Sequence, residues 1–423
     1  MTAQHLPGDR AFFEEWSTRQ PDARRSLDRA RAVACELGTW DAMPPVLVVV
    51  GSKGKGTTAV HAAATLSATQ TDDGLRARVG LVSSPGLRTN RERVRLDGLA
   101  VSAEEYEEMA RGLIRARASV PAAGSGYLSP TGAFTITGAA WAARGADVLV
   151  LEEGLGGLSD EVSLFDPSVV AVTRVFYEHG DLLGPTVGDV ARDLLGVVGP
   201  ATRTVVTVAQ DAEVAAIIEE AAARYGAEVV TLAADPATSV PAGLAPLTRM
   251  NAALGEAAAR ALASVLGWRV DDDVAATTLA SVQVPGRMSR HAFDGIPVMV
   301  DGAISPEGVA AAVAEYLAWH GTLDTVVASF PDTKDVAACF AELRGFDRVI
   351  PARADDYLRF TEAEALHGEV VDARTAIARG IEGARAGSGG CLLIGTQSYV
   401  GIALDVLDVD TDTAYLAPEP RPY

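Results

Sequence analysis

The stretch from Val46 to Thr58, VLVVVGSKGKGTT, constrains the fold of this chain more than any other part. Its first five residues are an apolar run that is too short for a helix and predicts a strand buried on both faces. The glycines that follow allow a tight turn with uncovered backbone amides, and Thr57 and Thr58 open an alanine-rich helix. A strand, a glycine loop and a helix N-terminus in this order predict a cradle for a polyphosphate.

The side chains of this loop suit a nucleotide. We expect Lys55 to contact the β and γ phosphates and Thr57 to bind Mg²⁺. The spacing G-x-x-G-K-G-T differs from the commoner G-x-x-x-x-G-K-[ST], and a glycine turn without a ligand is the alternative. The residues predicted to line the phosphate site are Gly51, Ser52, Lys53, Gly54, Lys55, Gly56, Thr57 and Thr58.

The rest of the chain alternates apolar runs with helix-compatible segments, which predicts an α/β fold with a mostly parallel sheet covered by helices. A long helix is expected over 11–38, and Ser102 with Glu105 forms a capping box at the start of another. Ligands of parallel sheets bind beyond the carboxyl ends of the strands. Ser84, Glu152 and His179 each follow a predicted strand, so we expect them along the same rim as the phosphate loop.

Length and composition limit the remaining choices. The chain has 423 residues, which predicts at least two domains, and its net charge of −20 argues against nonspecific binding to nucleic acids or anionic membranes. Neither a signal-peptide core nor an apolar run of membrane-spanning length is evident, so we expect a cytoplasmic protein, monomeric or a small homo-oligomer. Cys35, Cys339 and Cys391 lack metal-type spacing and are expected to be buried free thiols. The last dozen residues are expected to be frayed.

Several motifs follow in a fixed order along the chain. They are VGSKGKGT at 50–57, SSPGL at 83–87 with ERV at 92–94, EEGLGGLSD at 152–160, EHGDLLG at 178–184, ARDLLG at 191–196, Asn251, PGR at 285–287 and DGAISP at 301–306. In that order they resemble the Mur ligase superfamily, most closely its folylpolyglutamate synthase and dihydrofolate synthase branch. The resemblance covers nearly the whole chain.

The resemblance implies a P-loop-type ATP-binding domain over 1–284 and a smaller Rossmann-like α/β domain over 285–423. It implies an ATP-dependent ligase that activates a small-molecule carboxylic acid as an acyl phosphate and joins it to an amine or amino acid. In this likeness Lys55, His179 and Arg287 are catalytic, and Asn251, Arg287 and Asp301 contact ATP. Thr57, Ser84 and Glu152 hold one Mg²⁺, and His179 helps to hold a second. The alternative readings are a solvated carboxylate for Glu152, a loop hydrogen bond for His179, and interdomain salt links for Arg287 and Asp301.

The departures from the family pattern shape the functional expectation. Leu194 stands where the family has a carbamylated lysine, so any second metal needs another ligand, for which Glu153 is one candidate. Gly86 replaces a histidine, Leu158 an arginine, and Ile304-Ser305 a His-Asn pair. We therefore expect a ligase for an acid other than a folate. The alternatives are an ATP-binding regulatory or scaffolding subunit with impaired catalysis, and a dihydrofolate or folylpolyglutamate synthase.

Overall fold

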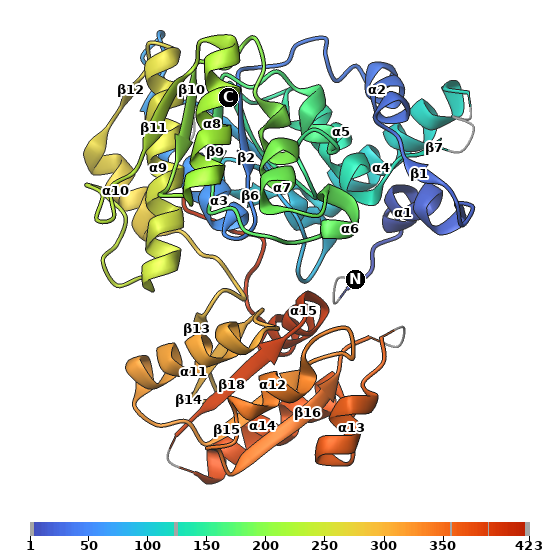
Figure 1. The fold of residues 1–423 in the computed structure, drawn as a ribbon, viewed down its shortest axis with the longest axis vertical. Helices are drawn as coiled ribbons and strands as arrows, with labels where there is room; N and C mark the ends of the chain where they lie inside the picture. The colour runs from blue at the N-terminus through green and yellow to red at the C-terminus, as the bar shows by residue number, and fades with distance from the viewer. Residues whose placement is uncertain (1–3, 122–125, 356–357, 388, 419–423) are drawn as a thin grey trace. The chain divides into compact units, whose positions relative to one another are not determined.

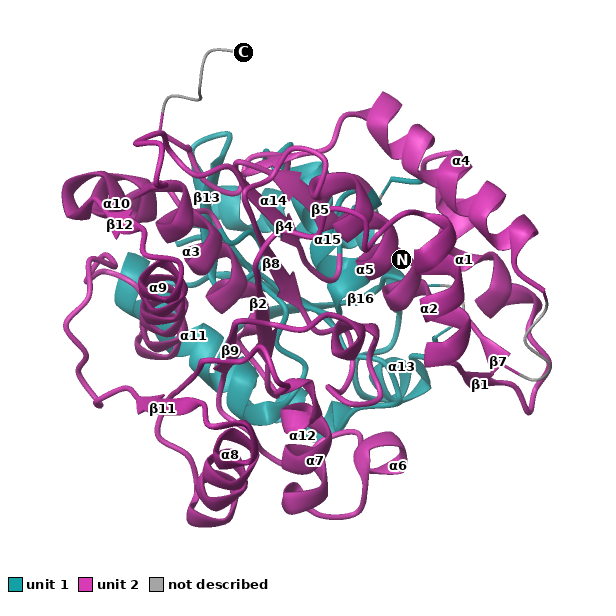
Figure 2. Ribbon diagram, turned by 90° about the horizontal axis from the view of Figure 1, so that it is seen from above, with its two compact units in different colours: residues 1–5, 86–90, 284–411 teal, residues 6–85, 91–283, 412–423 magenta. Residues whose placement is uncertain are grey.

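The computed structural model describes residues 4–121, 126–355, 358–387 and 389–418. The chain forms two compact units (Figure 2). Unit 1 comprises residues 1–5, 86–90 and 284–411, and unit 2 comprises residues 6–85, 91–283 and 412–423. The expected division into 1–284 and 285–423 therefore differs from the structure at three short segments that cross between units.

Unit 2 is built on an eight-stranded sheet with the order β11-β10-β9-β2-β8-β4-β5-β6. The strands β11 to β4 pair in parallel, whereas β5 and β6 are added antiparallel at one edge. A mostly parallel sheet is thus confirmed. The strands, in sheet order, are Glu228–Thr231, Thr204–Thr207, Val169–Val172, Val46–Val50, Val148–Glu152, Val79–Val82, Val94–Leu96 and Leu99–Ala100.

Helices cover both faces of this sheet, and its central strands β2 and β8 are buried at every position (Figure 1). Val46, Val48 and Val50 belong to one apolar cluster with the helices α5, α7 and α8. Since side chains alternate along a strand, the intervening residues of β2 face the helices α3 and α9. The bounds are α5 (Pro130–Ala142), α7 (Val187–Leu194) and α8 (Ala212–Tyr225) on the first face, and α3 (Lys55–Ser67), α9 (Pro246–Val265) and α10 (Asp272–Ala280) on the second.

The single helix expected over 11–38 is wrong. The structure has α1 (Asp9–Thr18) and α2 (Leu27–Glu36), separated by the short strand β1 (Arg24–Arg25), which pairs with β7 (Gly126–Tyr127). Pro21 interrupts the helical pattern, and the Ser26 side chain caps α2 by accepting from the Arg29 amide. The expected capping box is confirmed at the start of α4 (Ala103–Ser119). A two-stranded pair joins β3 (Thr69–Gln70) to β12 (Arg269–Val270).

Unit 1 holds a six-stranded sheet with the order β13-β14-β18-β15-β16-β17, in which only β13 is antiparallel. Two apolar clusters lie on its two faces, one with α14 and α15 and one with α11, α12 and α13. The strands in sheet order are Ser289–Phe293, Ile296–Asp301, Cys391–Gly395, Thr325–Ser329, Arg348–Arg353 and Val371–Asp372. The helices α11 to α15 are Pro306–His320, Val336–Ala341, Thr361–His367, Ala373–Ala386 and Gln397–Val406.

Two expectations about the periphery are corrected. The segment 412–418 is not frayed, because Tyr415 is 1% exposed, Asp412 pairs with Arg91 at 2.7 Å and Thr413 bridges to Leu99. Residues 419–423 lie outside the described residues. Cys35 is exposed rather than buried, whereas the other two thiols are buried.

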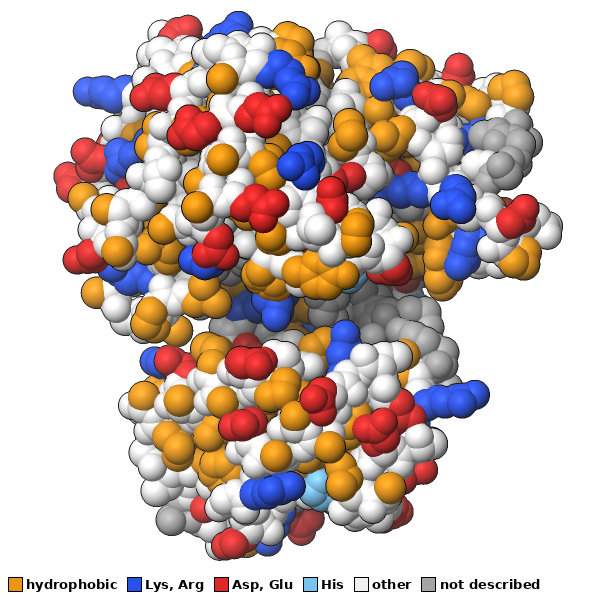
Figure 3. Space-filling model, in the orientation of Figure 1, with side chains coloured by type: hydrophobic (Ala, Val, Ile, Leu, Met, Phe, Trp, Pro, Cys, Tyr) orange, Lys and Arg blue, Asp and Glu red, His pale blue; other side chains and the backbone are white. Residues whose placement is uncertain are grey.

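The surface of each unit carries acidic and basic side chains interspersed on the visible face (Figure 3). Among the described helices, none has both the length and the apolar character that a membrane crossing requires.

Candidate active site

The phosphate loop leaves β2 at Val50 and enters α3 at Lys55, two residues before the expected helix start. Gly51 and Gly54 have φ angles of 130° and 93°, which glycine adopts without strain. A Cβ on Gly54 would lie 2.2 Å from the side-chain nitrogen of Asn251 in α9. The Asn251 carbonyl in turn accepts a hydrogen bond from the Thr58 hydroxyl at 3.0 Å. The loop is therefore closed on one side by Asn251, the residue that the resemblance places at the nucleotide.

Lys55 points back into the loop. Its ammonium donates to the carbonyl oxygens of Gly51 and Ser52 at 2.6 and 3.2 Å, and it pairs with the Glu153 carboxylate at 3.3 Å. Burial acts to lower the pKa of Lys55, but the neighbouring carboxylates, Glu153 first, outweigh it, and the pKa is raised. Lys55 is therefore a positive charge held in place at the N-terminus of α3.

Glu152 is the last residue of strand β8 and Glu153 follows it; both are buried beside the loop. Glu152 accepts from the Ser84 amide at 2.9 Å, and its carboxylate oxygens lie 3.4 and 3.5 Å from where a Cβ on Gly56 would be. The Glu152 carboxylate thus sits over the first turn of α3, next to Thr57. A Cβ at position 56 would be in ordinary van der Waals contact with this carboxylate.

Ser84 is held from the other side by Arg93, which donates to its hydroxyl at 2.8 Å. The Arg93 guanidinium also lies 4.5 Å from the ring centroid of Phe134, and burial lowers the pKa of Arg93 to about 10. The structure therefore brings Ser84 and the first turn of α3, where Thr57 lies, to the Glu152 carboxylate. Hard oxygen ligands of this kind suit Mg²⁺. Over the described parts of the chain, no three His, Cys, Asp or Glu side chains are grouped as a metal site, so a metal here depends on the two hydroxyls.

His179 is placed differently from these three residues. It is exposed and precedes the short helix α6 (Gly180–Leu183) with a φ angle of 49°. Its neighbour Glu178 acts on the charge of Lys55, so this segment lies near the phosphate loop. Ser52 fastens the segment, because its hydroxyl exchanges hydrogen bonds with the backbone of Phe176 at 3.1 and 3.0 Å. The metal-binding role of His179 stays a prediction.

The positions that depart from the family pattern lie in different surroundings. Leu194, at the end of α7, is 1% exposed and belongs to the apolar cluster on the face of the sheet that α5, α7 and α8 cover. A Cβ on Gly86 would lie 2.2 Å from the Thr89 carbonyl oxygen, so a histidine does not fit without moving the backbone. Ser305 caps α11 by accepting from the Gly308 amide, whereas Leu158 is a largely exposed side chain.

Arg287 and Asp301 lie together within unit 1. The carboxylate oxygens of Asp301 accept from the amides of Met288 and Ala303, both at 2.8 Å. Burial raises the pKa of Asp301, and the charge of Arg287 acts in the opposite direction. The Arg287 guanidinium lies 2.9 Å from where a Cβ on Gly302 would be. Asp301 is therefore held in place beside an exposed arginine, and the nucleotide contact that the resemblance assigns to the two residues stays a prediction.

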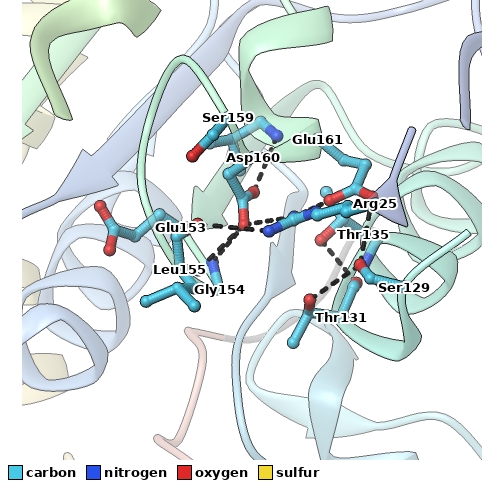
Figure 4. A network of polar contacts seen from close by, with 12 residues as sticks. Arg25, Ser129, Thr131, Thr135, Glu153, Gly154, Leu155, Ser159, Asp160 and Glu161 are labelled. Carbon is cyan, nitrogen blue, oxygen red and sulfur yellow. Dashed lines mark hydrogen bonds and ion pairs between the residues drawn. The ribbon is translucent and has the colours of Figure 1, made fainter. Parts of the chain in front are cut away.

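One group of polar residues was not predicted from the sequence. Arg25, from β1, pairs with Asp160 at 2.7 Å and with Glu161, and donates to the Leu155 carbonyl at 3.2 Å (Figure 4). Asp160 also accepts from the amides of Gly154 and Leu155 at 3.2 and 2.9 Å, which fixes the turn after Glu153. The only local signal was Asp160, the last residue of the EEGLGGLSD motif; nothing in the sequence connects it to Arg25.

Comparison with known proteins agrees with this architecture, although no protein-family model matches the chain. A probable bifunctional folylpolyglutamate synthase/dihydropteroate synthase of Halobacterium salinarum is 33% identical over 349 residues, which span 74% of this chain but only 40% of that protein. The dihydrofolate synthase/folylpolyglutamate synthase of Escherichia coli is 28% identical over 343 residues, 75% of each chain. The structure of Mycobacterium tuberculosis folylpolyglutamate synthase complexed with ADP and AMPPCP covers 95% of this chain and 99% of its own, with a TM-score of 0.77 at 23% identity. These matches confirm the resemblance and the shared fold.

Proposed function

We infer that this chain is a member of the folylpolyglutamate synthase and dihydrofolate synthase branch of the Mur ligase superfamily, and we propose that it is an ATP-dependent ligase that joins a folate-type acid to glutamate. The expectation of an acid other than a folate is given up, because the relatives are named as folate enzymes. The observation that carries the proposal is the convergence of Lys55, Thr57, Ser84 and Glu152 at the carboxyl ends of neighbouring strands.

The proposed reaction has two steps. A carboxylate oxygen of the acid attacks the γ-phosphorus of ATP, and ADP leaves with the electron pair of the broken P–O bond. The amine of glutamate then attacks the carbonyl carbon of the acyl phosphate and expels inorganic phosphate, and an amide forms. Mg²⁺, when bound, neutralises charge on the phosphates. Lys55 would stabilise the same charge, while Thr57, Ser84 and Glu152 would supply oxygen ligands to the ion.

A second candidate function is favoured by one observation. Leu194 occupies the position of the family's carbamylated lysine and is packed in an apolar cluster, so that anion is lost from the metal site. A chain without it could bind ATP as a regulatory or scaffolding subunit without turning it over. The charged groups that converge on the phosphate loop favour the enzyme, because a scaffold does not need them.

The test is a phosphate-release assay with ATP, Mg²⁺ and L-glutamate, in which dihydropteroate, a reduced folate and a panel of unrelated carboxylic acids are compared. Release with dihydropteroate or the folate, with the amide product detected by mass spectrometry, is the expected result. Lys55→Ala is the matched inactive control. ATP binding without release for any acid would favour the regulatory subunit, and release only with another acid would refute the folate assignment.

A further inference from the structure

The Glu153 side chain engages the phosphate loop at two points. One carboxylate oxygen lies 3.3 Å from the Lys55 ammonium, and the other accepts from the Gly51 amide at 3.3 Å. Glu153 is 3% exposed, so water does not screen these contacts. An ammonium and a backbone N–H of the glycine loop are the donors that such a loop offers to a phosphate. Burial raises the pKa of Glu153 to about 8, although Lys55 and the Gly51 amide act in the opposite direction. In its ionised form Glu153 is an anion from the protein itself at an anion-binding loop.

The contact with Glu153 affects phosphate binding because the Lys55 ammonium has a limited number of hydrogen-bond donors. An ammonium group has three donors and no acceptor. Its three partners are the carbonyls of Gly51 and Ser52 and the carboxylate of Glu153, so each donor already has an acceptor. A phosphate oxygen that bonds to Lys55 must take the place of one of them. The carbonyls belong to the backbone of the loop, whereas the Glu153 carboxylate can be displaced by rotation about the χ angles of its side chain.

The backbone on either side of Glu153 is fixed. Its amide donates to the Val49 carbonyl at 3.0 Å, and the next two amides are held by Asp160, which Arg25 pairs with in turn. Figure 4 shows the Glu153 carboxylate on the opposite side of this turn from Arg25, with no hydrogen bond or ion pair drawn between this carboxylate and the network, although the charge of Asp160 acts on it. Displacement of the carboxylate therefore requires rotation of one side chain and no change of the turn.

We propose that Glu153 is an internal competitor of the nucleotide, a carboxylate that occupies the lysine and an amide of the phosphate loop and has to leave them when a phosphate binds. The inference rests on the proposed nucleotide site. Glu153 affects the protein in two opposite ways. It stabilises the empty loop, because it pairs with the largely buried Lys55. It weakens nucleotide binding, because the contacts between Glu153 and the loop must break before a phosphate can bind. A structural ion pair would have the first effect only, and a metal ligand would strengthen binding of the metal complex.

The test is a calorimetric titration of the full chain with ADP and with AMPPCP, each with Mg²⁺ and with EDTA. The variants are Glu153→Val, which is apolar like the family residue at this position, and Glu153→Gln, which keeps the shape and one acceptor. The matched control is Glu178→Gln, because Glu178 acts on Lys55 through space and the hydrogen bonds of the described residues do not join the two. Thermal melting of the unliganded proteins is the second readout.

We expect Glu153→Val to bind both nucleotides about tenfold more tightly, the order of one charge-assisted hydrogen bond, and to melt at a lower temperature when empty. Glu153→Gln should show smaller changes in the same directions, and Glu178→Gln a smaller gain in affinity without a lower melting temperature. Unchanged affinity would overturn the inference, and so would weaker binding confined to the Mg²⁺ complex, which would make Glu153 a metal ligand. Absence of nucleotide binding in the unaltered chain would instead refute the proposed function.

Discussion

Leu194→Lys separates two views of the site, because it restores the side chain that the family carries. If position 194 faced a metal site, the lysine would be carbamylated and would lower the Mg²⁺ concentration needed for turnover. The structure argues otherwise, since Leu194 is 1% exposed and packs among apolar side chains of α7, β9 and the 3₁₀ turn Leu195–Val197. We therefore expect a buried lysine without a partner.

The cost follows from the protonation state. A buried lysine that is neutral in the folded state must give up its proton. Below its usual pKa of about 10.4, this deprotonation costs about 1.36 kcal/mol for each pH unit, which is about 4.6 kcal/mol at pH 7. Loss of the leucine's own packing adds roughly 2 kcal/mol. Since whole proteins are stable by only about 5–15 kcal/mol, the melting temperature should fall by at least about 10 °C.

The sign of the pH dependence checks the reasoning. Burial lowers the pKa of the introduced lysine in the folded state, so the unfolded state binds more protons and the stability of Leu194→Lys rises with pH. At pH 9 the deprotonation cost drops to about 1.9 kcal/mol. Thermal melts at pH 7 and pH 9 measure this change in stability. Leu194→Met, a control of similar volume, should lose little stability at either pH. A melting temperature equal to that of the unaltered chain at both pH values, or a bicarbonate-dependent fall in the Mg²⁺ requirement, would refute the burial argument.

Three further predictions concern the loop and its helix. Lys55→Ala should abolish measurable ATP binding in calorimetry and should also lower the melting temperature, because it removes the charged partner of the buried Glu153 side chain; unchanged ATP affinity would contradict the nucleotide assignment. Glu152→Ala should keep the fold in circular dichroism and lose ATP turnover by at least about a hundredfold, and turnover near that of the unaltered chain would exclude a metal role. Burial lowers the pKa of His61 to about 4, so protonation of the unfolded state should remove about 3 kcal/mol of stability as the pH falls from 6.5 to 4. In urea titrations across this range His61→Gln should be the less pH-sensitive protein, and parallel curves would count against a neutral buried His61.

The sequence by itself determined the parts of this protein whose cause is local. The apolar run of β2, the glycine loop and the helix after it are specified by adjacent residues, and so is the capping box of α4. The order of motifs was enough to predict the resemblance to folylpolyglutamate and dihydrofolate synthases, and the similar proteins confirm this resemblance. The mostly parallel sheet followed from the alternation of strands and helices, since such connections place successive strands side by side in the same direction.

Only the tertiary structure decided which distant residues meet. The pairing of Lys55 with Glu153, the support of Ser84 by Arg93 and the burial of Leu194 depend on sheet order and helix packing, for which one sequence carries no local signal. The return of the C-terminal segment to unit 2 has the same origin, because Tyr415 is buried by residues that lie hundreds of positions earlier in the chain. Motifs fix the chemistry that a position can offer, but burial and neighbouring charges fix whether that chemistry is available, and these arise only when the chain is folded.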